Sequence, residues 1–356
     1  MRIVILGLSI TSSWGNGHAT TFRGLVRELA KLGHDVLFLE RDQPWYADNR
    51  DLPHPPYGRT ALYGSLDELH ERFAAPVRDA DLVIVGSYVP DGIAVGDWVQ
   101  REARGIQAFY DIDTPVTLAR LARDQCAYLA REQIAGYDLY LSFTGGPTLR
   151  RLEHEFGSPR ARALYCSFDP QLYHPEPQPM EWDLGYMGTY SVDRQPSVDA
   201  FLLQAARQRP QGCFVVAGPQ YPDTDAWPAN VAYQPHLPPS EHRHFYNSQR
   251  FTLNVTRADM IAAGWSPSVR LFEAAACGTP ILSDRWAGIE SLLVPGREIL
   301  LVDDTADVLA ALATGEQERL RMAERARERI LAEHTAAHRA AELEGYAQEL
   351  LSGVAA

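Results

Sequence analysis

The N-terminal segment starts with "RIVILGL" (residues 2–8) and ends with "DVLFLE" (residues 35–40). Both are runs of mostly apolar residues, as expected for parallel strands that are buried on both faces. The segment between them holds a glycine loop and a helical face made of Phe22, Leu25, Val26 and Leu29. This order of strand, helix and strand predicts a βαβ unit of a doubly wound α/β sheet.

The same alternation continues through the rest of the chain. Further strands are expected at residues 81–87, 106–113 and 137–143, and then in "WDLGYMGTY", "CFVVAGPQ", "FTLNVT", "TPILSD" and "EILLVDD". A chain of 356 residues is long enough for two cores. We therefore predict two Rossmann-like doubly wound domains that face a central cleft. The expected parts are residues 1–170, a proline-rich linker at 171–182, a second domain at 183–335 and a C-terminal helix at 336–356.

Composition excludes several classes of function. The formal net charge is -13 and no basic run is present, so nucleic acid is not an expected partner. The four cysteines form no CxxC pair, which argues against a zinc site or a disulfide framework and for a reducing, cytoplasmic location. The N-terminal apolar run is expected to be a buried strand rather than a signal peptide. No apolar run approaches the ~20 residues of a membrane helix, so no integral membrane segment is expected.

The loop after the first strand, "SSWGNGHATTF" (residues 12–22), is a candidate ligand site. Gly15 and Gly17 allow backbone N–H groups to approach a ligand ahead of a helix N-terminus, which favours negative charge. The pattern also resembles a dinucleotide fingerprint, with Glu40 where a ribose-binding acid would follow the next strand. However, Gly15 lies seven residues after the apolar run ends at Leu8, whereas that fingerprint has its first glycine directly after the strand. A nicotinamide site is therefore the weaker alternative.

A second glycine loop, "GYMGTYSVDR" (residues 185–194), follows a predicted strand in the second half. Gly188 and Thr189 lie at the strand end, and Arg194 follows closely. A planar and permanently charged guanidinium group suits a diphosphate. The alternative is that Arg194 is an ordinary solvated surface arginine.

The segment "SVRLFEAAACGTPILSD" (residues 268–284) places a carboxylate on an apolar helical face. Ser266 as N-cap and Pro267 at the first helical position predict a helix whose free N–H groups form an anion site. Glu273 then lies two turns in, ~10 Å from those groups at ~1.5 Å per residue. That separation suits a diphosphate at the helix tip and ribose hydroxyls at the carboxylate. Alternatively, Glu273 reaches water at the edge of the face or pairs with an arginine.

This segment resembles the nucleotide-sugar signature of GT-B glycosyltransferases of the family 4 type, in which a glutamate precedes small residues, Cys-Gly and Thr-Pro. "YCSFDPQLYHP" resembles their crossing between domains, and "NVAYQPHLPPSEHRHFYNSQRFTLNVTR" their base-binding strand, helix and next strand. The motifs "GNGHATTFRGLVRELAKLGHDV", "FYDIDTP" and "YMGTYSVDR" are similar to those of the CgeB-like (spore maturation protein) group. The resemblance runs over nearly the whole chain.

The resemblance implies a role for several residues in donor binding. Glu273 would bind the ribose, and Arg194 the diphosphate through its side chain. The backbone N–H groups of Ser268, Val269 and Arg270 would bind the same diphosphate. The edge of the base would contact His236 and Leu237.

One departure from the family pattern concerns the donor sugar. Family 4 enzymes usually carry a second glutamate eight residues earlier, and this position is Trp265 here. Recognition of the sugar hydroxyls by a carboxylate is therefore in question. Trp14, Trp45 and Tyr46 are candidates for stacking on a sugar or another acceptor, although loop aromatic residues also serve packing.

The titratable groups expected beside the anomeric carbon are His18 and Asp113, with Asp111 a weaker candidate. The alternatives are that His18 is a loop hydrogen-bonder or cap and that Asp113 caps the following helix. We expect a glycosyltransferase that uses a nucleotide-diphosphate sugar, UDP-linked, as co-substrate, with an unidentified hydroxyl acceptor, no metal and no cofactor. The resemblance implies retention of configuration. The alternatives are a nucleotide-sugar epimerase or hydrolase, a dinucleotide-dependent oxidoreductase and a non-catalytic nucleotide-sugar binder.

Overall fold

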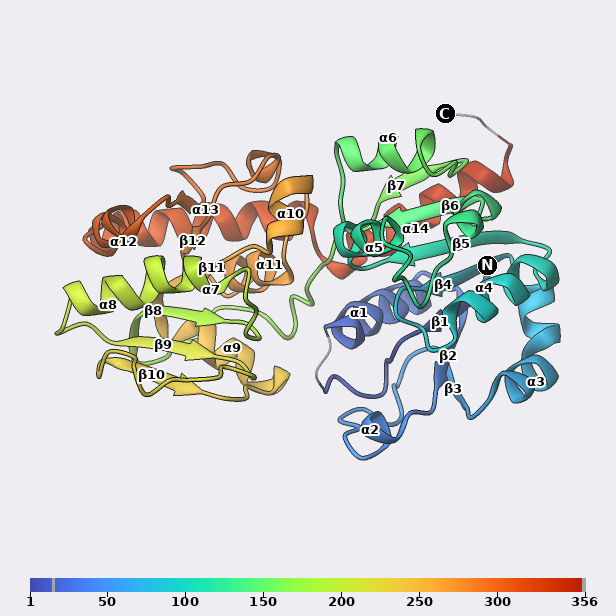
Figure 1. Ribbon diagram of the computed structural model, residues 1–356, viewed down its shortest axis with the longest axis horizontal. Coiled ribbons are helices and arrows are strands. Elements are labelled where there is room, and N and C mark those ends of the chain that lie inside the picture. Colours follow the sequence, from blue (N-terminus) through green and yellow to red (C-terminus); the bar gives the residue numbers. More distant parts are fainter. Residues whose placement is uncertain (15–16, 354–356) are drawn as a thin grey trace. The chain divides into compact units, whose positions relative to one another are not determined.

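The computed structural model describes residues 1–14 and 17–353, and the chain divides into two compact units (Figure 1). The first unit consists of Met1–Ser167 together with Ala336–Ala356, and the second of Phe168–Thr335. Each unit is a parallel sheet with helices on it, so the predicted pair of Rossmann-like doubly wound units is confirmed.

The first unit has a seven-stranded parallel sheet among its described residues, in the order β3-β2-β1-β4-β5-β6-β7. In the first six strands this is the Rossmann order, which reverses direction between β1 and β4. The strands are β1 (Arg2–Gly7), β2 (Asp35–Arg41), β3 (Arg59–Tyr63), β4 (Leu82–Gly86), β5 (Ile106–Asp111), β6 (Leu139–Ser142) and β7 (Ala161–Ala163). The helices are α1 (His18–Lys31), α2 (Pro44–Ala47), α3 (Leu66–Asp79), α4 (Gly92–Glu102), α5 (Thr114–Leu121), η1 (Arg131–Gly136), α6 (Pro147–His154) and α14 (Ala336–Leu351).

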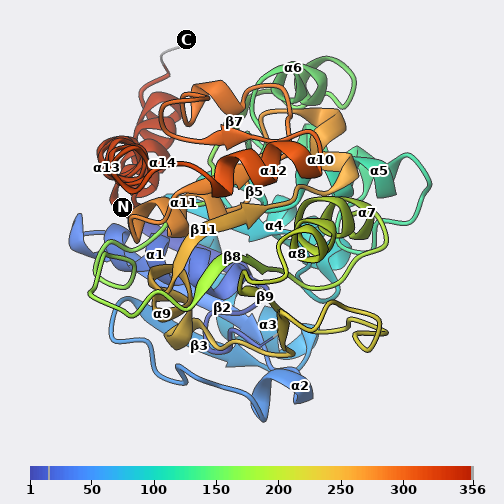
Figure 2. The ribbon, with the colours of Figure 1, turned by 90° about the vertical axis from the view of Figure 1, so that its left-hand side faces the viewer.

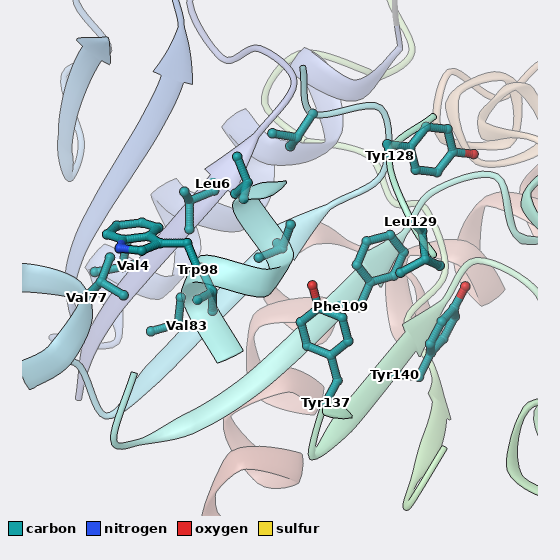
Figure 3. Close-up of a cluster of buried hydrophobic side chains, with 14 of the residues drawn as sticks. Val4, Leu6, Val77, Val83, Trp98, Phe109, Tyr128, Leu129, Tyr137 and Tyr140 are labelled. Carbon is teal, nitrogen blue, oxygen red and sulfur yellow. The ribbon is translucent and has the colours of Figure 1, made fainter. Parts of the chain in front are cut away.

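One core of this unit lies between the sheet and the helices α3, α4 and α5. Figure 3 shows Val4 and Val83 from neighbouring strands close to Trp98 of α4. Farther along the sheet, the ring of Phe109 lies 5.5 Å from that of Tyr137 and 5.4 Å from that of Tyr140. Strands β1, β4 and β5 are buried on both faces, which is why their sequences are continuous apolar runs.

The second unit has a six-stranded parallel sheet among its described residues, in the order β10-β9-β8-β11-β12-β13. This is again the Rossmann order, and its direction reverses between β8 and β11. The strands are β8 (Trp182–Met187), β9 (Phe214–Ala217), β10 (Val231–Gln234), β11 (Gln249–Asn254), β12 (Ile281–Ser283) and β13 (Leu300–Leu301). Figure 2 labels β8, β9 and β11 of this sheet. The helices are α7 (Gln195–Val198), η2 (Asp199–Leu203), α8 (Gln204–Gln208), α9 (Pro239–Asn247), α10 (Ala258–Ala263), α11 (Val269–Ala276), η3 (Ile289–Ser291), α12 (Thr305–Leu312) and α13 (Glu316–Glu333).

The boundary between the units lies after Ser167, three residues before the expected end of the first domain. The proline-rich segment expected to be a linker belongs to the second unit, because its side chains and backbone are bound there. Tyr173 is buried, and the Glu176 N–H donates to the Asn247 side chain at 3.0 Å. The Glu176 carboxylate also pairs with Arg243 at 2.8 Å.

The C-terminal helix α14 belongs to the first unit, where it packs against α1. A side chain at Gly24 of α1 would place its Cβ only 3.1 Å from the Cβ of Ala336. The Tyr346 hydroxyl donates to the carbonyl oxygen of Ala163 at 3.1 Å. Residues from the two ends of the sequence therefore complete one unit.

Candidate functional site

In the second unit, the ends of β8 and β11 are tied to the start of α11. Arg270 Nε donates to the Met187 carbonyl oxygen at 2.7 Å, and Arg270 Nη1 donates to Asn254 Oδ1 at 2.7 Å. The Ser268 hydroxyl donates to the same Asn254 oxygen at 2.7 Å. Strands β8 and β11 flank the point where the strand order reverses, which is where open α/β sheets bind ligands. The N-terminal turn of α11 is therefore held at the expected binding edge.

The guanidinium group of Arg270 is a buried cation at this edge. Arg270 is 7% exposed, and its Cζ lies 5.0 Å from the centre of the Tyr186 ring. None of the ion pairs formed by the described residues includes Arg270. A Cβ at Gly188 would lie 2.6 Å from the Tyr186 hydroxyl and 3.1 Å from Arg270 Nη2. Glycine at position 188 thus keeps the backbone close to a positive charge that a bound anion could neutralise.

Arg194 adds a second guanidinium group to this edge. Its Nε donates to the Ser191 hydroxyl at 3.0 Å, and its Nη2 donates to the carbonyl oxygen of Thr189 at 2.5 Å. Burial lowers the pKa of Arg194, and the charges of Arg270 and Arg257 lower it further, against an opposing effect of nearby tyrosines. A half-buried arginine with two cationic neighbours fits a diphosphate better than the solvated surface arginine considered above.

Helix α11 begins two residues later than the sequence predicts. Ser268, not Ser266, is the N-cap, and Val269, not Pro267, is the first helical residue. Trp265 adopts a left-handed φ of 43°, and its N–H donates to the carbonyl oxygen of Ala287 at 2.6 Å. This turn delays the helix, so the predicted N-cap was wrong. The Leu271 N–H donates to the Ser268 carbonyl oxygen at 3.2 Å, whereas helical geometry leaves the N–H groups of Val269 and Arg270 without intrahelical partners and available to an anion.

Trp265, at the position where the family pattern has a glutamate, packs against the neighbouring loop. A Cβ at Gly288 would lie 2.5 Å from the indole ring, so the ring rests directly on that glycine. An indole offers a stacking surface and one donor where a carboxylate would offer acceptors. Trp265 therefore offers hydrogen-bonding groups at this position that differ from those of the glutamate in the family pattern.

Glu273 is 3% exposed on a helix that is buried on all sides from Arg270 to Ala276. Its Oε2 accepts a hydrogen bond from the Tyr246 hydroxyl at 3.1 Å and lies 3.8 Å from His242 Nδ1. Tyr173 also forms a side-chain hydrogen bond with Glu273. The partners of this carboxylate are thus two tyrosines and a histidine, and the alternative in which it reaches water or pairs with an arginine is wrong. A carboxylate has room for further donors, such as ribose hydroxyls.

The two residues predicted to contact the base lie on the loop after β10. His236 is exposed, and Leu237 is partly buried. His242 Nε2 is 3.3 Å from the carbonyl oxygen of Leu237, while its Nδ1 faces Glu273. His242 therefore connects the predicted base-binding loop to the predicted ribose-binding carboxylate.

The sequence did not identify Asn254, or the side chain of Arg270, as site residues. Asn254 is fully buried at the end of β11, and its Nδ2 donates to Thr256 and Ser283. Asn254 comes directly after the apolar residues of a predicted strand, at the carboxyl end where open α/β sheets bind ligands. This position could have identified it. For Arg270 we predicted a role of the backbone N–H alone.

In the first unit, the reversal point between β1 and β4 brings His18 and Asp113 together around Tyr88. The rings of His18 and Tyr88 meet edge to face at 5.4 Å, and the Tyr88 hydroxyl donates to Asp113 Oδ2 at 2.9 Å. Tyr88 has a left-handed φ of 63°, which is uncommon for an aromatic residue and occurs preferentially at functional sites. Asp113 occupies the N-cap position of α5, but its side chain makes no capping bond.

His18 is the first residue of α1, and its Nδ1 is buried without a hydrogen-bond partner among the described residues. Burial lowers the pKa of His18 to about 4. The imidazole is therefore neutral near pH 7, and it is a weaker base than the sequence-based expectation of a group matched to neutral pH.

Asp111, the weaker candidate, is fully buried at the end of β5. It accepts hydrogen bonds from the hydroxyls of Tyr140 at 2.6 Å and Thr117 at 2.8 Å and from the Asp113 N–H at 3.1 Å. Burial raises the pKa of Asp111 to about 6. These bonds position the segment that carries Asp113, and they give Asp111 a structural role.

The loop after β1 is held by Glu40, the residue that a dinucleotide site would use for ribose. Glu40 is fully buried and accepts bonds from the N–H groups of Ile10 at 2.6 Å and Thr11 at 3.0 Å and from the Thr11 hydroxyl at 2.6 Å. A carboxylate engaged in this way does not suit the nicotinamide alternative. Gly17 is the N-cap of α1, whereas Gly15 lies outside the described residues.

The aromatic residues proposed for stacking differ in exposure. Trp14 and Trp45 are each 50% exposed, while Tyr46 is buried.

The described residues include no group of three or more His, Cys, Asp or Glu side chains placed to hold a metal ion. None of the described helices is long and apolar enough to span a membrane.

The fold is that of the GT-B class, as three similar solved structures show. Sucrose-phosphate synthase from Thermosynechococcus elongatus is similar to this chain with 15% identity and a TM-score of 0.71, over 99% of this chain and 100% of that one. Anabaena HepE in complex with UDP-glucose has 14% identity and a TM-score of 0.71 over the same shares. An α-glucosyltransferase in complex with UDP and a 13-mer DNA has 14% identity and a TM-score of 0.72, over 98% of this chain and 99% of that one.

A family model matches part of the chain, from the start of α7 into α14. Residues 194–345 match the family described as glycosyl transferase-like. The matched segment starts at Arg194 and includes α11 with Glu273, so this part of the chain is a glycosyltransferase domain. No curated protein matches the chain by sequence.

Proposed function

We propose that the protein transfers a sugar from a UDP-linked donor to a hydroxyl acceptor. The observation that carries the proposal is the arrangement of Arg194 and Arg270 beside the N-terminal turn of α11, with Glu273 one turn farther along the same helix. This arrangement combines two cations and free helical N–H groups for a diphosphate with a carboxylate for a ribose.

The donor is proposed to lie along the binding edge of the second unit. The N–H groups of Ser268, Val269 and Arg270, the Arg194 side chain and the loop at Gly188 and Thr189 would contact the diphosphate. The loop at His236 and Leu237 would contact the base. The complexes of HepE with UDP-glucose and of the α-glucosyltransferase with UDP support the choice of a uridine nucleotide.

Charge stabilisation is the main catalytic requirement at this site. When the bond between the anomeric carbon and the phosphate oxygen breaks, UDP leaves with its electron pair, and the acceptor oxygen forms the new bond and loses a proton. Arginines and helical N–H groups can stabilise the leaving diphosphate, so we propose that no metal or other cofactor is required. In the retaining reaction that we favour, a phosphate oxygen accepts the proton.

The identity of the acceptor follows from neither the fold nor the family match. One structurally similar protein is complexed with DNA, but the net charge of -13 argues against a DNA acceptor here. We propose a small or uncharged hydroxyl acceptor, a cytoplasmic location and membership in the CgeB-like group. His18 and Asp113 are proposed to contact the reacting sugar or the acceptor.

The proposed function can be tested with UDP-glucose, UDP-galactose and UDP-N-acetylglucosamine labelled in the sugar. In the presence of a panel of hydroxyl acceptors, we expect one UDP to be released for each label that appears on an acceptor. Equal release of free labelled sugar without acceptor would instead identify a hydrolase. A change of the sugar while it stays attached to UDP would identify an epimerase.

His18 provides a test of the stereochemical course. Because its pKa of about 4 makes it a weak base, we expect His18→Ala to lower kcat by less than about tenfold and to raise the KM for the donor. The exposed His54 in the same unit provides a control, His54→Ala, that should change neither constant. A loss of about a hundredfold or more in kcat, with unchanged donor binding and an inverted product, would instead make His18 the general base.

A further inference from the structure

The second unit contains a pocket of about 430 Å³ whose lining residues are not among those assigned to the donor. Its aromatic part consists of Tyr190, Tyr221 and Trp227. The ring of Tyr221 lies 5.6 Å from that of Tyr190 and 5.4 Å from that of Trp227, both edge to face. The volume falls in the range of about 300–1,000 Å³ that is usual for small-molecule sites.

The pocket is also lined by side chains of the helical segment formed by α7, η2 and α8. The lining residues of this segment are Gln195, Asp199, Leu203, Gln204 and Arg207. The middle of the segment, η2, is a π-helical turn. Such turns are rare inside α-helices and occur frequently at functional sites, because the extra residue shifts side chains toward one face.

The charges of the lining select among ligand classes. Asp199 and Asp223 contribute two carboxylates and Arg207 one guanidinium group, and Gln195 and Gln204 add neutral amides. The excess of carboxylates disfavours an anion such as phosphate, and the arginine disfavours a cation. Carboxylates and amides that accept bonds from hydroxyl groups, together with aromatic faces, suit a neutral, hydroxyl-rich ring.

We propose that this pocket binds a neutral saccharide. The site is separate from the proposed donor edge but is joined to it, because the Tyr221 hydroxyl donates to the Gly188 carbonyl oxygen at 3.2 Å. The inference does not depend on the catalytic assignment, since it rests on the pocket lining alone. The saccharide site and the transferase activity can therefore be tested independently. Saccharide binding without transfer would support only the pocket, and transfer without saccharide binding would support only the proposed function.

The test is saturation-transfer NMR on the full chain with four disaccharides, namely maltose, cellobiose, lactose and chitobiose, without UDP. We expect at least one of them to bind saturably with Kd below about 10 mM, which corresponds to a weak site. Trp227→Ala should weaken that binding at least tenfold, and Trp227→Phe should retain most of it. Leu172→Ala, which removes an exposed apolar side chain of the same unit that does not line the pocket, should have no effect.

Circular dichroism and cooperative thermal unfolding show whether the Trp227 variants are folded, and Asp199→Asn offers a second variant with little change in shape. Asp199→Asn should also weaken binding of the same disaccharide. The proposal is wrong if none of the four disaccharides saturates. It is also wrong if binding is unchanged in folded Trp227→Ala, or if choline or inorganic phosphate displaces the disaccharide.

Discussion

Arg270→Ala should weaken UDP binding by about 10- to 150-fold, one of the two largest losses that we expect from single substitutions in the second unit. The substitution removes a charged donor, and interactions of this kind contribute about 1.5–3 kcal/mol. It also removes the bonds that hold the Met187 carbonyl and Asn254 at the ends of β8 and β11. We therefore expect the free energy of unfolding to fall by about 1–3 kcal/mol as well.

Two further variants separate the charge of Arg270 from its geometry. Arg270→Lys keeps the charge but loses the planar fork, so its UDP affinity should lie between those of the parent and Arg270→Ala. Arg285→Ala is the matched control, because Arg285 also lies near the end of a strand but forms an exposed pair with Asp303. Its effect on stability and binding should be close to zero. Parent-like UDP affinity in folded Arg270→Ala would refute the role of this cation.

The second large effect is expected at Glu273. Glu273→Gln keeps an oxygen that can accept from the Tyr246 hydroxyl, so the melting temperature should stay near that of the parent. The loss of charge-assisted bonds to the ribose should weaken UDP binding by about 1–3 kcal/mol, or about 5- to 150-fold. Calorimetric titration measures this change.

Removing the ribose hydroxyls provides the direct control for Glu273. UDP that lacks the 2′ and 3′ hydroxyls should bind the parent and Glu273→Gln with nearly equal affinity, because the partner of the carboxylate is absent. Glu290→Gln changes an exposed carboxylate of the same unit and should have no effect on either ligand. If Glu273→Gln unfolds more easily but binds UDP as the parent does, Glu273 has only a structural role.

In the first unit the central strands could be predicted from the sequence, but the two edge strands could not. Strands β1 and β4 are buried on both faces, and this environment requires the continuous apolar runs that reveal them. Strand β3 lies at the edge of the first sheet, starts with the exposed Arg59 and is mostly half-buried. Strand β7, at the opposite edge, has three residues. Neither has an apolar run, so neither was predicted.

The residues of the candidate site that local sequence spacing defines could be predicted. The positions of Glu273 and Arg194 follow from spacing and strand ends, whereas α11 starts two residues later than predicted. The partners of these residues come from distant segments, as when His242 meets both Glu273 and Leu237, and no local pattern contains such contacts. The low pKa of His18 arises from burial in the folded chain, so the sequence suggested a stronger base than the structure provides.

The central claim is that the second unit binds a uridine diphosphate without a metal. Its most direct test is calorimetric titration of the full chain with UDP and, separately, with NAD, in buffer that contains EDTA. We predict saturable binding of UDP and no binding of NAD. In thermal unfolding, the melting temperature should rise with UDP concentration but not with NAD concentration. A UDP concentration a hundredfold above Kd should add about 2.7 kcal/mol to the free energy of unfolding. Binding of NAD but not of UDP, or UDP binding that appears only after magnesium is added, would contradict the account.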